Sequence, residues 1–161
     1  MKYMSVLIVV DDVAKSRYFY ETILGQKVEV DFGENIGFVG GFAIHKKTSF
    51  NQLLKNKNII SGSNAFELYF EDDNLELIER KVKEEKVEFI HGIVEQPWKQ
   101  KVMRFYDYDK NIIEVGERLE HLTYRLSEAG NSIDEISKLT SIPKQNVDYL
   151  IKKYMVEKQK D

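Results

Sequence analysis

RFYDYDKNIIEVGE, residues 104–117, is the stretch that decides the fold. Its first residues are aromatic and apolar, its middle supplies turn residues, and its end returns to a strand pattern, which predicts a β-hairpin. Because neighbouring side chains of a strand point to opposite faces of a sheet, Ile113 and Val115 share one face and Glu114 lies on the other. Glu114 is therefore a carboxylate in an apolar strand. Its charge costs free energy unless it is paired, bound to a metal or exposed to a wet cavity.

The length and composition of the chain indicate one globular domain with an appendage. With 161 residues, 42% hydrophobic and 32% charged, it is too short for two ordinary domains and not typical of a disordered protein. No apolar run of about 18 residues occurs, so we expect no membrane span. The N-terminal MKYMSVLIVVDDVAK reads as a first strand rather than a signal peptide, because it lacks a small-residue cleavage site. We predict a cytoplasmic protein.

Cysteine content and net charge narrow the possible partners. The chain has no cysteine, which excludes disulfides and Cys-based zinc sites, so any metal would have to be held by His and carboxylate side chains. The formal net charge of −3 gives no general attraction for nucleic acid or for an anionic membrane. We expect neither of these as a partner.

The same order of elements is predicted twice along the chain. In the first half, a strand over residues 4–10 precedes a helix that ends at Gly25. In the second half, a strand over residues 66–70 precedes a helix with an acidic start at residues 72–73. The strands that follow the two helices are expected at residues 27–32, 37–39, 42–46, 87–90, 101–106 and 112–115.

This repeat predicts an α+β fold made of two tandem β-α-β-β-β modules. The modules cover about residues 1–50 and 62–118, which together form a domain over residues 1–118, with residues 48–63 as a polar linker. One helix covers only one face of a four-stranded sheet. The other face of each sheet must therefore find another partner or curl around a ligand.

Two motifs resemble those of the glyoxalase/bleomycin-resistance/extradiol-dioxygenase superfamily, also called vicinal oxygen chelate proteins. DDVAKSRYFYETILG, residues 11–25, is similar to the family's D-x-x-x-S-x-x-F-Y-x-x-x-L-G helix, and residues 104–117 are similar to its R-F-x-D-P-D-G-x-x-I-E hairpin. The resemblance spans roughly residues 1–118. It implies paired modules whose curled mixed sheets enclose a cavity, usually with a divalent metal that chelates the oxygens of the substrate.

The family's metal ligands usually occupy corresponding positions on the first and last strands of the modules. Counting back from the aspartates that open the helices places the first-strand positions on Ser5 and Ala65, neither of which replaces His or Glu as a ligand. The last-strand positions fall on His45 and Glu114. In the preferred register Glu67 points into the cavity beside Ala65. A site of His45, Glu67 and Glu114 would suit Zn, Ni, Mn or Fe ions, and a metal-free pocket is the alternative.

The resemblance implies a glyoxalase-like lyase or isomerase, or a related enzyme, that acts on a small oxygenated metabolite. With a metal as Lewis acid, Glu67 or Glu114 would be the catalytic base, and we favour Glu67. Tyr69 shares the face of Glu67 and would contact the substrate. Without a metal, the same cavity would bind or sequester a planar or hydrophobic compound, as resistance members of the family do.

Two further residues are candidates for ligand binding. Trp98 lies in a proline-containing loop and could stack on a ligand at the mouth of the cavity, although packing in the core or in a dimer interface explains it more readily. Arg104 either neutralises Glu67 or Glu114 or binds an anionic group of the substrate. We expect a small-molecule ligand and a homodimer.

Residues 119–161 lie beyond the usual end of the family and predict a helical extension. A capping box from Ser132 to Glu135 and a helix opened by Pro143 give the outline of a helix-turn-helix, which allows a third function, a ligand sensor with a DNA-reading tail. Residues 143–161 contain five lysines, three acids and no arginine, a thin footprint for phosphate contact. We therefore expect a helical cap on the sheets or on a second subunit.

Overall fold

The computed structural model describes residues 1–159, and the chain divides into two compact units. The first unit contains Met1–Leu68, Arg80–Phe89 and Phe105–Ile113. The second unit contains Tyr69–Glu79, Ile90–Arg104 and Glu114–Asp161. Segments of the two units alternate along the chain. The domain and module boundaries that the sequence repeat predicts therefore stay a prediction.

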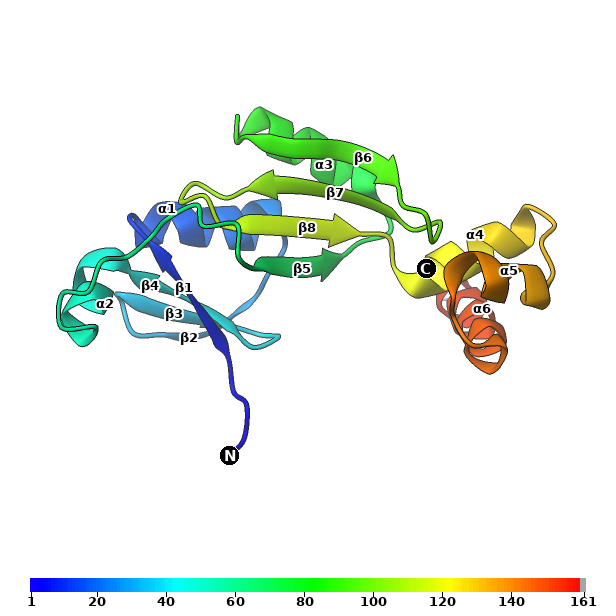
Figure 1. Ribbon diagram of the computed structural model, residues 1–161, viewed down its shortest axis with the longest axis horizontal. Coiled ribbons are helices and arrows are strands. Elements are labelled where there is room, and N and C mark those ends of the chain that lie inside the picture. The colour runs from blue at the N-terminus through cyan, green and yellow to red at the C-terminus, as the bar shows by residue number, and fades with distance from the viewer. Residues whose placement is uncertain (160–161) are drawn as a thin grey trace. The chain divides into compact units, whose positions relative to one another are not determined.

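The first unit contains a four-stranded sheet with the strand order β1-β4-β3-β2 (Figure 1). Its strands are β1 (Val6–Val10), β2 (Val28–Asp31), β3 (Asn35–Phe38) and β4 (Phe42–Lys46). β1 runs parallel to β4, and β3 pairs antiparallel with β4 and β2. Alternate side chains such as Ile8, Ile36 and Ile44 are buried, which is the period of two expected for a sheet with one covered face.

The helix that covers this face begins and ends at the predicted residues. Asp12 caps it by accepting a hydrogen bond from the Lys15 backbone N–H at 3.0 Å. α1 (Val13–Tyr18) continues into a π-helical segment, η1 (Phe19–Ile23), and packs against β3 and β4. Gly25, with φ of +65°, ends the helix, because this backbone conformation favours glycine.

The segment between the two modules contains a helix that the sequence analysis did not predict, α2 (Lys47–Leu53). Phe50 helps to stabilise this helix, since its ring packs against the His45 ring with centroids 5.5 Å apart. Ser49 Oγ also donates a hydrogen bond to the Lys46 carbonyl oxygen at 3.0 Å. The helix depends on these contacts more than on a clear amphipathic pattern, so the sequence alone did not predict it.

A second four-stranded sheet repeats the topology of the first, with the order β5-β8-β7-β6. Its strands are β5 (Glu67–Glu71), β6 (Phe89–Glu95), β7 (Lys101–Tyr106) and β8 (Ile112–Gly116), and α3 (Leu75–Glu84) follows β5 (Figure 1). The two sheets confirm the predicted α+β fold of two β-α-β-β-β modules. β6 was expected near residues 87–90, but it begins at Phe89 and continues to Glu95, because the glycine at position 92 does not end the strand.

The hairpin turn of the opening motif packs on α1 within the first unit. Asp107 is buried and accepts a hydrogen bond from the Tyr20 hydroxyl at 2.9 Å. Asp109 accepts hydrogen bonds from the Asp11 backbone N–H at 2.7 Å and the Ser16 hydroxyl at 3.3 Å. The two motifs that carry the family resemblance are thus in direct contact.

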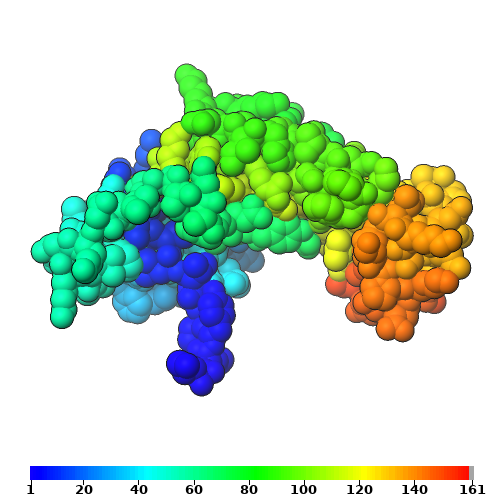
Figure 2. Space-filling view, viewed as in Figure 1, coloured from blue at the N-terminus to red at the C-terminus, as the bar shows by residue number. Residues whose placement is uncertain are grey.

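The C-terminal extension forms three helices in the second unit, as predicted. α4 (Leu119–Glu128), α5 (Ile133–Thr140) and α6 (Lys144–Lys158) pack around a core of Leu122, Leu126, Ile136 and Val147. Figure 2 shows these helices as one compact group at the yellow-to-red end of the chain. The capping box of Ser132 and Glu135 is confirmed. None of the helices within residues 1–159 is long and apolar enough to cross a membrane.

Candidate functional site

A hydrogen-bonded group of side chains lies at one end of the second sheet. Gln100 is buried, and its Nε2 donates hydrogen bonds to the Tyr69 hydroxyl at 2.9 Å and to the Glu117 carbonyl oxygen at 2.7 Å. Its Oε1 accepts a hydrogen bond from Trp98 Nε1 at 3.0 Å. Tyr69 is 47% exposed and Trp98 is 43% exposed. Gln100 therefore holds two exposed aromatic side chains in fixed positions.

Gly116 on β8 leaves room for this group. A Cβ atom at Gly116 would lie 2.8 Å from the Tyr69 hydroxyl and 3.2 Å from Gln100 Nε2. Any larger residue would displace one of these two side chains. The glycine therefore allows Tyr69 to lie across the neighbouring strand.

The environment of Tyr69 keeps its hydroxyl protonated. Partial burial, together with a hydrogen bond of 2.9 Å to Glu71 Oε1, raises the pKa of Tyr69 to about 12. The hydroxyl accepts from Gln100 and donates to Glu71, so the three side chains form one polar chain. At neutral pH this chain presents a neutral phenol to any ligand.

The raised pKa of Tyr69 gives a prediction for alkaline pH. A tyrosine whose pKa is higher in the folded state contributes stability below its unfolded value of about 10, and this contribution is lost as pH rises through the folded value. We expect stability to fall more steeply between pH 10 and 12 in the wild type than in Tyr69→Phe. Thermal unfolding of both proteins across this range measures the difference. Parallel curves would contradict the assignment.

Arg104 and Glu114 form an ion pair on the same face of the second sheet. The Glu114 side chain is only 7% exposed, and its Oε2 contacts Arg104 NH2. Arg104 NH1 also lies 3.3 Å from His91 Nε2. Of the roles considered for Arg104, neutralisation of Glu114 is therefore observed. The pair explains how a carboxylate is accommodated in an apolar strand.

His45 and Glu67 belong to the first unit. His45 lies on β4 opposite Asn35 on β3, and its Nδ1 is 3.0 Å from Asn35 Nδ2. On β5, Glu67 is exposed and Leu68 is buried, so Glu67 does not face the core, and its predicted position in a cavity stays a prediction. The catalytic role predicted for Glu67 stays a prediction.

The residues at the family's metal positions do not fit a tightly held divalent metal. Ser5 is a weak ligand whose hydroxyl donates to the Val6 carbonyl oxygen at 2.9 Å, and Ala65 has no ligand atom. The charge of Glu114 is already paired with Arg104. Within residues 1–159, no group of three or more His, Asp and Glu side chains is placed to hold a metal ion.

Two residues of the second unit were missed in the sequence. Gln100 organises Tyr69 and Trp98, and Glu117, only 2% exposed, binds the guanidinium of Arg125. Gln100 directly precedes β7, and alternation along that strand places its side chain on the same face as Arg104. This alternation was the sequence signal that could have identified Gln100 as a site residue. Glu117 ends the opening motif, but its burial depends on a helix that the family pattern does not include.

Two sheets of identical strand order, each with a helix after its first strand, define the class of paired β-α-β-β-β proteins. Residues 3–120 match the family model of the glyoxalase-like domain. The chain belongs to this family and thus to the glyoxalase/bleomycin-resistance/dioxygenase superfamily that the two motifs resemble.

Solved structures of other proteins have a similar fold. A protein of unknown function from Agrobacterium tumefaciens str. C58 is 36% identical, with a TM-score of 0.67 over 74% of this chain and 95% of its own. A glyoxalase/bleomycin resistance protein/dioxygenase family enzyme from Burkholderia phytofirmans PsJN is 15% identical, with a TM-score of 0.60 over 74% and 100%. A lactoylglutathione lyase from Agrobacterium tumefaciens is 17% identical, with a TM-score of 0.54 over 72% and 92%. Curated proteins gave no match.

Proposed function

We propose that this chain binds a small, planar, oxygenated compound on the face of its second sheet that carries Tyr69, without a metal. The observation that carries the proposal is the pair of exposed aromatic side chains, Tyr69 and Trp98, held by the buried Gln100. Aromatic rings fixed in this way provide apolar contact area at a low cost in conformational entropy. A planar ligand can stack on them.

The Arg104–Glu114 ion pair supplies the polar end of the proposed site. Glu114 lies two residues before Gly116 on β8, which is about 7 Å along the strand. Gly116 adjoins the Tyr69 hydroxyl, so one small ligand can reach both the aromatic rings and the ion pair. The guanidinium of Arg104 suits a carboxylate or a hydroxyl group of the ligand. In the free protein, Glu114 balances this charge.

Binding of planar acids tests the proposal. We expect isothermal titration calorimetry to detect benzoate and 2,3-dihydroxybenzoate, and the fluorescence of Trp98, the single tryptophan, to change on binding. Trp98→Ala should weaken binding about tenfold, because it removes an aromatic contact and the apolar area of the ring. Tyr149→Ala is the matched control, since Tyr149 is an exposed aromatic residue on α6.

The same titration separates the metal-free proposal from a metal-dependent enzyme. With a chelator present, the wild type and Tyr149→Ala should bind the planar acids equally well. Binding that requires added zinc or manganese would contradict the metal-free site. So would an unchanged affinity in Trp98→Ala. The lyase or isomerase activity expected from the family, the homodimer and the cytoplasmic location stay predictions.

A further inference from the structure

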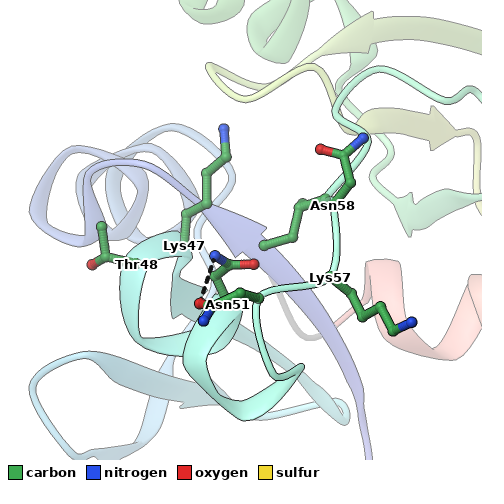
Figure 3. Close-up of a pocket in the computed structure, with 7 residues that line it drawn as sticks. Lys47, Thr48, Asn51, Lys57 and Asn58 are labelled. Atoms are coloured by element: carbon green, nitrogen blue, oxygen red, sulfur yellow. Dashed lines mark hydrogen bonds between the residues drawn. The ribbon is translucent and has the colours of Figure 1, made fainter.

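The first unit contains a hollow that lies between α2 and the segment that follows it. The hollow has a volume of about 420 Å³ and is lined by Lys47, Thr48, Asn51, Lys57 and Asn58 among others. Figure 3 shows Asn58 across the hollow from Lys47 and Asn51. The volume lies within the range of about 300–1,000 Å³ that is usual for small-molecule sites.

The lining is rich in hydrogen-bond donors and contains no carboxylate. Lysine ammonium groups and the amides of asparagine suit an anionic group with several acceptor oxygens. The surrounding sequence has the same bias, because residues 35–66 contain four lysines and no Asp or Glu, in a chain with 27 acidic residues. This segment is therefore locally cationic within a protein of net negative charge.

The two lysines of the lining are available to a ligand. Lys47 Nζ lies 3.2 Å from Asp11 Oδ1, but the Asp11 side chain is 70% exposed, and such exposed pairs contribute little and can exchange. The Lys57 side chain has no carboxylate partner within residues 1–159. A dianionic ligand would therefore displace only one weak interaction.

The backbone around the hollow is held in place before any ligand binds. The Asn56 backbone N–H donates to the Asn51 carbonyl oxygen at 2.9 Å, and that of Lys57 donates to the Leu54 carbonyl oxygen at 3.2 Å. Asn51 Nδ2 also donates to Asn56 Oδ1 at 3.3 Å, which Figure 3 marks with a dashed line. An ordered segment loses less conformational entropy when it binds a ligand.

We propose that this hollow binds a phosphorylated small metabolite, with Lys47 and Lys57 at the phosphate group. Thr48 and the asparagine amides contact its hydroxyl groups, and Ile59 with the aliphatic part of Lys47 contacts its carbon skeleton. The volume exceeds what a lone phosphate needs, which favours a phosphate carried on an organic body. The residues that line this hollow belong to the first unit, and none of them belongs to the planar-compound site proposed above.

The probes are inorganic phosphate, glycerol 3-phosphate, glucose 6-phosphate and unphosphorylated glucose, titrated calorimetrically into the full chain at low ionic strength. We expect a phosphorylated probe to bind more tightly than phosphate and glucose not to bind. The double variant Lys47→Gln/Lys57→Gln should weaken binding about tenfold or more, since each lysine makes a charge-assisted hydrogen bond. Lys55→Gln is the matched control, because Lys55 lies in the same segment and is exposed but does not line the hollow.

The outcome is decided by the two variants. A tenfold loss in the double variant with an unchanged Lys55→Gln supports the site. Failure of all three phosphate-bearing probes to bind would overturn it, as would equal losses in the double variant and in Lys55→Gln, which would indicate general charge attraction. Binding of benzoate in the same samples keeps a failure here distinguishable from a failure of the proposed function.

Discussion

Replacement of Arg125 by alanine is expected to destabilise the second unit by about 3 kcal/mol, because a buried carboxylate is left without its main counter-charge. Glu117 is 2% exposed, and Arg125 Nε and NH2 bind its two carboxylate oxygens at 2.8 and 2.9 Å. Arg125 NH2 also donates to the Lys99 carbonyl oxygen at 2.9 Å. This expected loss of about 3 kcal/mol lies at the low end of the values for breaking buried ion pairs, because the Arg125 side chain is 28% exposed.

Urea unfolding followed by far-ultraviolet circular dichroism, which reports on both units, measures this effect. Arg17→Ala is the matched control, because Arg17 also contacts two carboxylates, at 2.6 and 2.8 Å, but its side chain is 39% exposed. Exposed ion pairs contribute about 1 kcal/mol or less, so the control should lose little stability. The double variant Glu117→Gln/Arg125→Met should be more stable than Arg125→Ala, since no uncompensated charge remains. A loss in Arg125→Ala as small as that of the control would contradict the prediction.

The family motifs predicted the fold well because their residues contact one another. Phe19 of the helix motif packs against Phe105 of the hairpin motif, with ring centroids 6.4 Å apart. Tyr20 and Asp107 join the same two segments through a hydrogen bond. Either motif alone specifies a helix or a hairpin, whereas the pair specifies the contact that places them together. The α2 helix was missed because its sequence shows no comparable pattern.

The candidate site was less predictable because its geometry depends on residues far apart in the sequence. Alternation placed Glu114 and Arg104 correctly, and their ion pair was one of the alternatives considered. Alternation also places Gln100 on the face of Arg104, but a glutamine beside a strand is usually a surface residue, so the sequence did not indicate that it is buried. Its role follows from contacts with Tyr69 and with the Glu117 backbone, which only the folded chain brings together.

Replacement of Asp107 by alanine is expected to destabilise the first unit by about 3 kcal/mol or more, because it removes the acceptor of four hydrogen bonds. The donors are the Tyr20 hydroxyl at 2.9 Å, the Asp109 and Asn111 backbone N–H groups at 2.9 and 2.8 Å, and Asn111 Nδ2 at 2.8 Å. Tyr20 is completely buried, so its hydroxyl would be left without a partner in the core. Burial also raises the pKa of Tyr20 well above its usual value, so the stranded hydroxyl would stay protonated.

A double-mutant cycle with Tyr20→Phe isolates the buried part of this loss. Tyr20→Phe alone should cost about 1 kcal/mol, and the double variant should be more stable than the sum of the two losses predicts, because no donor is stranded. Asp72→Ala is the matched control, since Asp72 Oδ1 accepts a hydrogen bond from the Asn74 backbone N–H in a similar turn without a buried tyrosine. Urea unfolding followed by far-ultraviolet circular dichroism gives the free energies. Strict additivity would show that the Tyr20 hydroxyl finds another partner when Asp107 is removed, and the Tyr20–Asp107 hydrogen bond would then not be the cause of the large loss.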